Sequence, residues 1–440
     1  MAEKQKKLDA AARLALLFDD GVYTELDAAD ASGARAGYGS VCGATVFAYA
    51  EGEKDGAFGG AAARKLAKVY DLAEKTGSPV VAIYDSQGVR LADGLDTLEA
   101  CSELLARSAR ISGVVPQIAV VAGTCGGFAS LCASMADVCL MKKDAELFLT
   151  APFVDAAKGG KGCAADGAFA EKAGSAAVVC KDEAELFGKT RQLLQLLPLN
   201  NLAAAPVCEF DAPEKTCDSC AVLGSIDGGS GIELFAHKGS AVRTCIATMG
   251  GTTVGVAEVK GRLCRGDSAK YARLVQLCDA FSIPVVSFVD SEGFLLSAEN
   301  DANGGIRNAA ILSHTLAEAT TVKVSVITGS AIGSVYAVLC GKNTGSDMCY
   351  AWPTATVSAL APKTAVGVLW EDRIEKESDI DTLAAQYAAE EANAEKALKA
   401  GAVDRVITPA ETRAVLIDTI DMLASKRVSR LSKKHGNLPY

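Results

Sequence analysis

The sequence predicts an α/β fold made of two tandem domains that arose by internal duplication. Two observations support this prediction: three sequence blocks recur in the same order, and each copy alternates helices with short β-branched strands. The recurring blocks are 65–75 with 270–280, 78–88 with 283–293, and 120–128 with 326–334. Two long copies indicate a duplicated domain rather than a solenoid of short repeats.

Each copy begins with a helix and a strand. In KLAKVYDLAEK, at 65–75, the apolar residues Leu66, Val69 and Leu72 recur at helical spacing. The following PVVAIYD, at 79–85, is a short β-branched run of the kind that forms a strand buried on both faces. Because helices and strands alternate, we expect largely parallel sheets with right-handed crossovers.

The next strand of the first copy ends in a glycine turn. Between positions 111 and 136 no residue is charged, but Pro116 and Gly123 interrupt the segment. We therefore interpret it as a strand from Gln117 to Ala122, a glycine turn and a buried helix rather than a membrane span.

The duplication places a domain boundary after LPLNN at 197–201, so the domains are expected at 1–205 and 206–440. The segment 203–220 has no apolar periodicity, which is typical of a linker. Near the C-terminus we expect one charged, Ala-rich helix over 384–401. A further helix is expected to begin at TPAET, with Thr408 as N-cap residue and Pro409 at the first helical position.

Composition excludes several classes of function. Half of the 440 residues are hydrophobic and 22% are charged, as in a folded protein. A net charge of −10 argues against a nucleic-acid binder, because phosphate binding needs a basic surface. The opening MAEKQKKLDAAARL lacks the apolar core of a signal peptide, so we expect a cytoplasmic protein whose 15 cysteines are reduced.

Side chains suggest neither a metal site nor a hydrolytic triad. Cys217 and Cys220 have CxxC spacing, but the three histidines of the chain are far away in sequence. Ser130 and His314 lack the GxSxG motif that a nucleophilic serine of this kind would need. Asp85 and Asp290 each follow a strand, and could act as bases or could cap the loops that follow.

The two glycine turns have the more informative pattern. VVAGTCGGFASL and VITGSAIGSVYAVL both read as strand, glycine turn and helix. A helix that starts directly after a strand presents unpaired backbone N–H groups, and two such groups can stabilise an enolate or a similar anion. The expected positions are Gly126, Gly127 and Phe128 in the first copy and Gly333, Ser334 and Val335 in the second. Close helix–strand packing is the alternative explanation for the glycines.

At these residues the sequence resembles a known family, the carboxyltransferase subunits of biotin-dependent acyl-CoA carboxylases and sodium-pumping acyl-CoA decarboxylases. The resemblance covers nearly the whole chain. Its matching segments include RLALLFDDGVYTELD (13–27), DSQGVRLADGLDTL (85–98), AWPTA (351–355) and AGAVDRVITPAETR (400–413).

The resemblance implies two crotonase-like (ClpP/crotonase) domains, each a spiral of ββα units. It implies that acyl-CoA lies on the N-terminal domain and that biotin, carried by a separate protein, enters from the C-terminal domain. The carboxyl group would move between biotin N1 and the α- or γ-carbon of the acyl-CoA, through two backbone oxyanion holes. Biotin itself can take the α-proton in this chemistry, so no protein base is implied.

By the same resemblance, further residues are expected to bind substrate. They are Gly59, Gly60, Ser86, Gln87, Gly88, Tyr336 and Ala337. Phe128 and Val335 stand where the family has small residues, which predicts a narrower site.

The resemblance also implies partners. A dimer or hexamer of this chain is expected, together with a biotin carrier protein and either a biotin carboxylase or a membrane decarboxylase subunit. The complex could therefore sit at the membrane periphery. A crotonase-like acyl-CoA hydrolase or isomerase and a non-catalytic scaffold subunit are the alternative functions.

Overall fold

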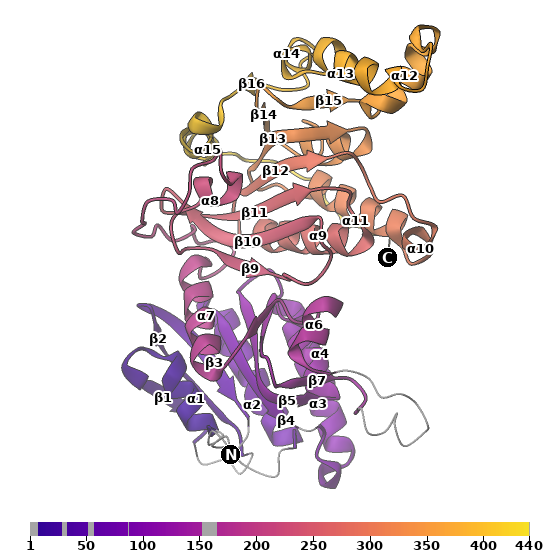
Figure 1. Cartoon of the computed structure of the whole chain (residues 1–440). Coiled ribbons are helices and arrows are strands. Elements are labelled where there is room, and N and C mark those ends of the chain that lie inside the picture. Colours follow the sequence, from indigo (N-terminus) through magenta and orange to yellow (C-terminus); the bar gives the residue numbers. More distant parts are fainter. Residues whose placement is uncertain (1–7, 29–32, 52–56, 87, 152–164, 440) are drawn as a thin grey trace, which may run out of the picture. The chain divides into compact units, whose positions relative to one another are not determined.

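The computed structural model describes residues 8–28, 33–51, 57–86, 88–151 and 165–439. The chain divides into two compact units (Figure 1). Unit 1 comprises Met1–Pro206 and Phe235–His237, and unit 2 comprises Val207–Leu234 and Lys238–Tyr440.

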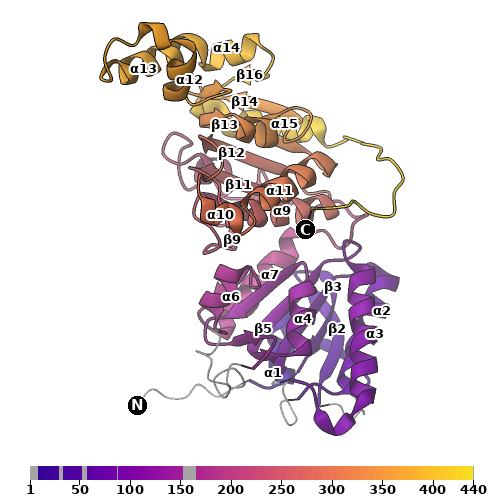
Figure 2. The ribbon, with the colours of Figure 1, turned by 90° about the vertical axis from the view of Figure 1, so that its right-hand side faces the viewer.

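Unit 1 contains one sheet in the order β1-β2-β3-β4-β5-β6-β8, and β7 also pairs with β5. The first three strands are antiparallel and the rest are parallel. The strands are β1 Tyr23–Leu26, β2 Arg35–Val41, β3 Ala44–Ala50, β4 Val80–Ser86, β5 Gln117–Gly126, β6 Val138–Lys142, β7 Glu146–Phe148 and β8 Val178–Cys180. The helices are α1 Ala10–Leu17, α2 Gly60–Thr76, α3 Leu95–Ile111, α4 Phe128–Met135, α6 Gly167–Ala173 and α7 Glu183–Leu196. Helices α2 and α3 lie side by side (Figure 2), and their buried residues share one core with the facing strands.

Unit 2 repeats this plan. Its sheet runs β16-β14-β13-β12-β11-β10-β9, and β15 pairs with β13 as β7 does with β5. The strands are β9 Ile232–Leu234, β10 Val242–Met249, β11 Thr252–Lys260, β12 Val285–Ser291, β13 Lys323–Ile332, β14 Met348–Ala351, β15 Thr356–Ser358 and β16 Arg405–Val406. The helices are α8 Ala221–Ser225, α9 Arg265–Ala280, α10 Ala298–Ala302, α11 Gly305–Glu318, α12 Pro362–Leu369, α13 Asp379–Glu391, α14 Ala394–Lys399 and α15 Pro409–Leu423, with a π-helix at Tyr336–Cys340. The expected largely parallel α/β sheets are therefore present in both units.

A duplicated polar contact holds the β2–β3 hairpin of unit 1 and the β10–β11 hairpin of unit 2. In unit 1, Asp19 accepts hydrogen bonds from two N–H groups of the β2–β3 turn, at 3.0 and 3.1 Å, and pairs with Arg191 of α7 at 2.6 Å. In unit 2, Asp227 accepts from two N–H groups of the β10–β11 turn, at 3.0 and 2.9 Å, and pairs with Arg413 of α15 at 2.5 Å. The same device in both copies is a second trace of the duplication.

Three local expectations need correction. Strand β5 continues to Gly126, beyond Ala122, because β7 pairs with its far end. The Ala-rich segment 384–401 is not one helix, because the Asn393 side chain accepts from the N–H of Lys396 at 2.8 Å and so starts α14. The helix after the second glycine turn is a π-helix in its main part. The expected helix start at Thr408 is confirmed as a capping box with Glu411.

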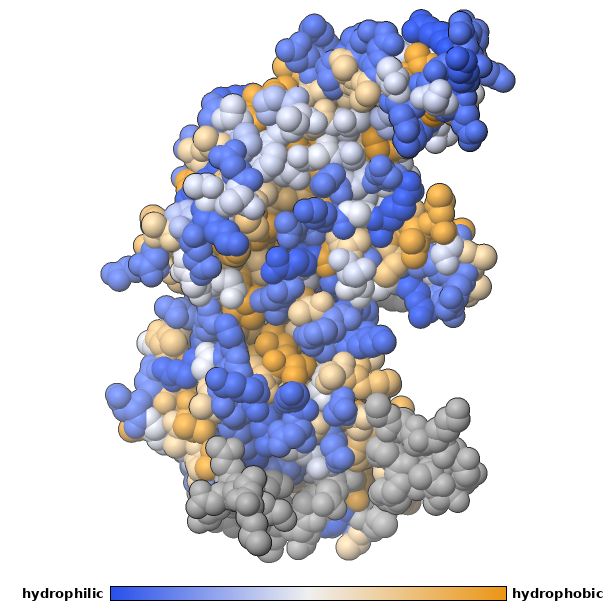
Figure 3. Space-filling view, viewed as in Figure 1, coloured by the Kyte–Doolittle hydropathy of each residue, from blue (hydrophilic) through white to orange (hydrophobic). Residues whose placement is uncertain are grey.

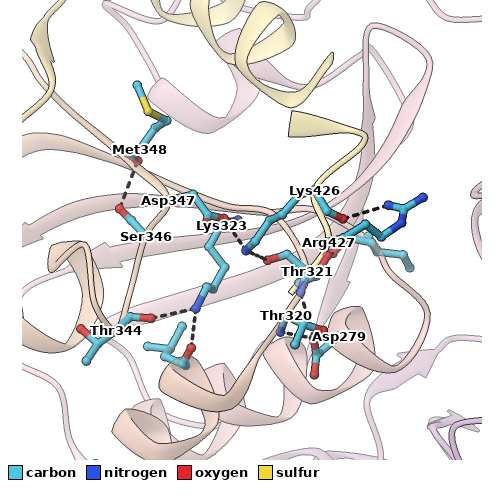
Figure 4. A network of polar contacts seen from close by, with 12 residues as sticks. Asp279, Thr320, Thr321, Lys323, Thr344, Ser346, Asp347, Met348, Lys426 and Arg427 are labelled. Atoms are coloured by element: carbon cyan, nitrogen blue, oxygen red, sulfur yellow. Dashed lines mark hydrogen bonds and ion pairs between the residues drawn. The ribbon is translucent and has the colours of Figure 1, made fainter. Parts of the chain in front are cut away.

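The C-terminal segment of unit 2 is fixed to the start of β13 (Figure 4). Lys426 Nζ donates to the Thr321 carbonyl and to the Asp347 carboxylate, both at 2.8 Å. The same carboxylate accepts the backbone N–H of Lys323 at 2.8 Å. The buried Lys323 ammonium donates to the Thr344 carbonyl at 2.8 Å, and burial lowers its pKa. One network thus joins β13, the loop before β14 and the C-terminal segment.

Candidate active site

Each unit has a glycine turn where a parallel strand passes into a helix. Gly127 caps α4 with φ +60° and ψ −124°, and Gly333 has φ +59° directly after β13. An L-residue rarely adopts this backbone, so glycine is required at both turns. The N–H of Ala337 donates to the Gly333 carbonyl at 3.3 Å, which makes Gly333 the N-cap residue of the second helix.

The hydrogen bonds of the turns identify which N–H groups can reach a ligand. The N–H of Gly127 donates to the Phe148 carbonyl at 2.9 Å, and that of Gly333 to the Ser358 carbonyl at 2.8 Å. These two glycines shape the turns but are not donors to a ligand, which corrects that part of the expectation. Gly126 lies one residue earlier, as the last residue of β5 and opposite Phe148 in its ladder.

The next N–H groups along each turn are the candidate donors. Phe128 and Ala129 are the first two helical residues of the first turn, and Ser334 and Val335 are those of the second. The first N–H groups of a helix have no intrahelical acceptor. The two turns therefore present equivalent pairs of donors at the positive ends of two helices.

The side chains at the two turns differ. The Phe128 ring packs on the buried Phe58 ring, with 5.8 Å between centroids. Val335 is fully buried, whereas Ser334 is exposed. The Tyr336 hydroxyl donates to the Ala402 carbonyl at 2.8 Å, and Ala337 is exposed. The narrower site expected from Phe128 and Val335 stays a prediction.

The loop after β4 is held next to the start of α2. Ser86 Oγ lies 3.3 Å from the N–H of Gly88, which has φ +133°. The N–H of Phe58 donates to the Gly88 carbonyl at 2.7 Å, and the N–H of Arg90 donates back to the Phe58 carbonyl at 2.8 Å. Gln87 lies outside the described residues. Unit 2 repeats this arrangement with Ser291 and Gly293, at 3.2 Å.

Gly59 and Gly60 allow this loop to approach closely. A Cβ atom on Gly59 would lie 2.5 Å from a carboxylate oxygen of Asp93, and one on Gly60 would lie 2.5 Å from Asp96. The N–H of Gly60 donates to Asp93 at 3.1 Å. The two glycines are thus explained by packing, and they bring Phe58 and the loop together beside the first turn.

Arg90 is a candidate site residue that sequence reasoning missed. Its Nε and Nη2 atoms are buried, and within the described residues neither has a hydrogen-bond partner. Its Nη1 would lie 3.4 Å from a Cβ placed on Gly59. Buried guanidinium N–H donors without partners favour the binding of an anion, because they have lost the hydrogen bonds of water without compensation. The sequence signal that could have pointed to Arg90 is its position in the DSQGVR segment at 85–90.

Asp85 and Asp290 hold backbone rather than act as bases. Asp85 accepts the N–H of Thr124 at 3.3 Å, and Asp290 accepts the N–H of Ser330 at 2.8 Å. Asp85 is also paired with the buried Arg13 at 2.7 Å. These contacts favour the capping interpretation.

The described residues contain no group of three or more His, Cys, Asp or Glu side chains arranged to hold a metal ion. Of the expected CxxC pair, Cys217 is buried with its sulfur 3.5 Å from Ser225 Oγ. Among the helices that the structure describes, none is both long and apolar enough to cross a membrane.

The two duplicated parallel-sheet units define the fold class as two crotonase-like domains. The crystal structure of transcarboxylase 12S, described as a hexamer with hydrolysed methylmalonyl-coenzyme A bound, superposes with a TM-score of 0.92. Identity is 29%, and the match covers 99% of this chain and 93% of that one. Each unit therefore has the expected crotonase-like fold.

The chain belongs to the carboxyl transferase domain family, whose model matches residues 7–438. It is 33% identical to the methylmalonyl-CoA decarboxylase subunit alpha of Veillonella parvula, over 99% of this chain and 94% of the relative. It is 31% identical to the mitochondrial propionyl-CoA carboxylase beta chain of Sus scrofa, over 99% of this chain and 89% of that relative. The methylmalonyl-CoA carboxyltransferase 12S subunit of Propionibacterium freudenreichii subsp. shermanii is 32% identical, over 93% of this chain and 84% of that relative. The expected family, which uses biotin and acyl-CoA, is confirmed.

Proposed function

We propose that this chain is the carboxyltransferase subunit of a multi-subunit, biotin-dependent complex that acts on an acyl-CoA of the methylmalonyl-CoA or propionyl-CoA type. The observation that carries the proposal is the pair of equivalent donor turns, one in each unit. The reaction needs two such sites, because one oxygen of the thioester and one of the biotin ureido group each gain negative charge. Relatives named as decarboxylase, carboxylase and carboxyltransferase subunits support the same reaction class.

In unit 1, the N–H groups of Phe128 and Ala129 would hold the thioester oxygen of the acyl-CoA. The start of α4 adds the positive end of its helix dipole. In unit 2, the N–H groups of Ser334 and Val335 would hold the ureido oxygen of biotin. When bound, biotin on its separate carrier protein supplies or accepts the carboxyl group. The equal geometry of the two turns fits this use, because both ligands present a planar carbonyl oxygen.

Arg90 supports the assignment of acyl-CoA to unit 1. A carboxylated acyl-CoA carries an anion close to the thioester, and the unpaired Nε and Nη2 donors of Arg90 can bind a carboxylate with two parallel hydrogen bonds. Arg90→Gln is expected to raise KM for the carboxylated acyl-CoA by about tenfold or more. This change in KM corresponds to the loss of one charge-assisted hydrogen bond. Arg64→Gln is the matched control, since Arg64 is half-exposed and already pairs with Asp96.

The surface supports a homo-oligomer. Leu95 at the start of α3 is 78% exposed, and Ile306 at the equivalent start of α11 is 72% exposed. Apolar surface also lies around α10 (Figure 3), and Leu296 just before α10 is 84% exposed. Equivalent apolar sites on both units fit contact with a second copy of this chain. We propose a dimer or hexamer that binds a biotin carrier protein and either a biotin carboxylase or a membrane decarboxylase subunit.

The test is turnover by the purified chain with free biotin. Malonyl-, methylmalonyl- and glutaconyl-CoA are supplied one at a time, and the decarboxylated CoA product is followed. Product that requires biotin is the expected result. Free CoA or a rearranged acyl-CoA formed without biotin would instead identify a crotonase-like hydrolase or isomerase, and no turnover by the folded protein would identify a scaffold subunit.

A further inference from the structure

A buried carboxyl group lies at the end of β3, two strands from the strand that leads into the first glycine turn. Glu51 directly follows β3, and its N–H donates to the Ile83 carbonyl of β4 at 3.1 Å. The residue is only 5% exposed, so its side chain enters the core of unit 1. The Tyr49 hydroxyl donates to Oε1 at 3.1 Å, whereas Oε2 is buried with no hydrogen-bond partner among the described residues.

The strand ladders place Glu51 near the turn. Ala50, the residue before Glu51, lies opposite Ile83 of β4, and Ser86 of β4 lies opposite Cys125 of β5, the residue before Gly126. Glu51 thus lies two strands away from the end of β5 that leads into the turn. Among the described residues, the titratable groups that interact with it are Tyr49, Tyr84, Asp85, Cys101, Cys125 and Cys132.

Neither lysine nor arginine is among these groups, and Asp85 is already paired with Arg13. Burial raises the pKa of Glu51 to about 8, against smaller opposing effects of the Tyr49 hydroxyl and of the Asp85 N–H. Burial also raises the pKa of Cys101 to about 11 and the pKa values of Tyr84 and Cys125 further. Within this cluster, Glu51 is thus the group that ionises slightly above neutral pH.

We propose that Glu51 is a positioning residue of the first glycine turn: it acts as a neutral carboxylic acid, and its ionisation places an anion near the turn that weakens oxyanion binding. The inference rests on the proposed function, since the oxyanion is that of the acyl-CoA. An anion beside the developing negative charge is unfavourable in a site from which water is excluded. The residue does not touch substrate, so its effect passes through the N–H groups of Phe128 and Ala129.

The test is the pH profile of kcat for biotin-dependent decarboxylation, measured from pH 6 to pH 9.5. The wild-type rate is expected to fall at high pH, by roughly tenfold at pH 9, because one ionisation removes activity in proportion to the ionised fraction. Glu51→Gln cannot ionise and should keep its pH 7 rate at pH 9. Glu99→Gln, on the exposed side of α3, is the control and should follow the wild-type profile.

Tyr49→Phe provides an independent variant if Glu51→Gln does not fold. The Tyr49 hydroxyl favours the ionised carboxylate, so its removal should move the alkaline decline to higher pH. If the rate of Glu51→Gln declines at the same alkaline pH as that of the wild type, the role of Glu51 is overturned but the proposed function stands. Where Glu51→Gln does not fold, the same conclusion follows if Tyr49→Phe declines at the wild-type pH. No biotin-dependent turnover by the wild type at pH 7 overturns the proposed function and, with it, this role.

A second readout is independent of activity. The pKa of Glu51 is higher in the folded than in the unfolded chain, so the folded state keeps a proton that the unfolded chain loses above pH 4.5. The unfolding equilibrium constant should then rise with pH by up to about tenfold per pH unit until pH 8, and Glu51→Gln should lack this component. Equal pH slopes for both proteins contradict the protonated state on which the proposal depends.

Discussion

Removal of one N–H group from the second turn is the sharpest test of the backbone-donor argument. Gly333 is unsuitable, because its φ of +59° excludes proline and its N–H already donates to the Ser358 carbonyl. Ser334 is suitable: it is the first helical residue, it is exposed, and its N–H has no intrahelical acceptor. Proline is well tolerated at this helix position, so Ser334→Pro removes one donor and little else.

The expected loss follows from the number of donors. In the proposed function two N–H groups hold the ureido oxygen at this turn, and loss of one oxyanion donor costs about 10²–10³ in kcat, or roughly 2.7–4 kcal/mol. Ser334→Ala keeps the N–H and should retain nearly all activity. The assay is biotin-dependent decarboxylation, with thermal unfolding of both variants as the check on folding.

Two results would refute the reasoning. One is a folded Ser334→Pro protein with wild-type kcat. The other is an equal loss in Ser334→Ala, which would assign the effect to the hydroxyl group. Phe128→Pro makes the same change at the first turn, but it also removes the ring contact with Phe58 and needs Phe128→Ala as its control.

Three further predictions concern stability. Arg13→Ala leaves the buried Asp85 carboxylate without its 2.7 Å partner and should lower the free energy of unfolding by about 3–5 kcal/mol in urea titrations. Gly329→Ala would place a Cβ 2.2 Å from the Asp290 carboxylate and should cost about 1–3 kcal/mol; wild-type stability would contradict this packing. Hydrogen bonds hold the pKa of Asp19 below its ordinary value despite the opposing effect of burial, so its stabilising contribution is present above pH 3.8 and is lost as the pH falls. Asp19→Asn should therefore reduce the dependence of the free energy of unfolding on pH in the acid range. An unchanged pH dependence in this range would exclude this role of Asp19.

The duplicated sheet could be predicted from the sequence because buried strands and their flanking helices have strong periodic patterns. The boundary regions were less predictable. Nothing in AAQYAAEEANAEKALKAG shows that Asn393 ends one helix and caps another, because this depends on its bridge to Thr356, far away in sequence. The π-helix after Gly333 likewise has no sequence pattern of its own; it ends at Gly341, where a Cβ atom would lie 2.6 Å from the Ala337 carbonyl oxygen.

The candidate site could also be predicted only in part from the sequence. The glycine turns could be located from sequence, but not which N–H groups they leave unpaired. That Gly127 and Gly333 donate internally follows from the pairing of β7 and β15 with the preceding strands, two short segments without a sequence pattern. Arg90 and Glu51 could not be predicted for another reason: an isolated charged residue has no periodicity, and its significance appears only with its burial.

Transfer of the carboxyl group itself tests the central claim most directly. Acyl-CoA labelled with ¹³C in the free carboxyl group is incubated with the purified protein and free biotin at pH 7, and label on biotin is measured by rapid quench and mass spectrometry. The account predicts labelled carboxybiotin that forms in step with loss of label from the CoA ester and is lost in Ser334→Pro. Loss of label from the CoA ester at the same rate without biotin, or with none on biotin, would contradict it.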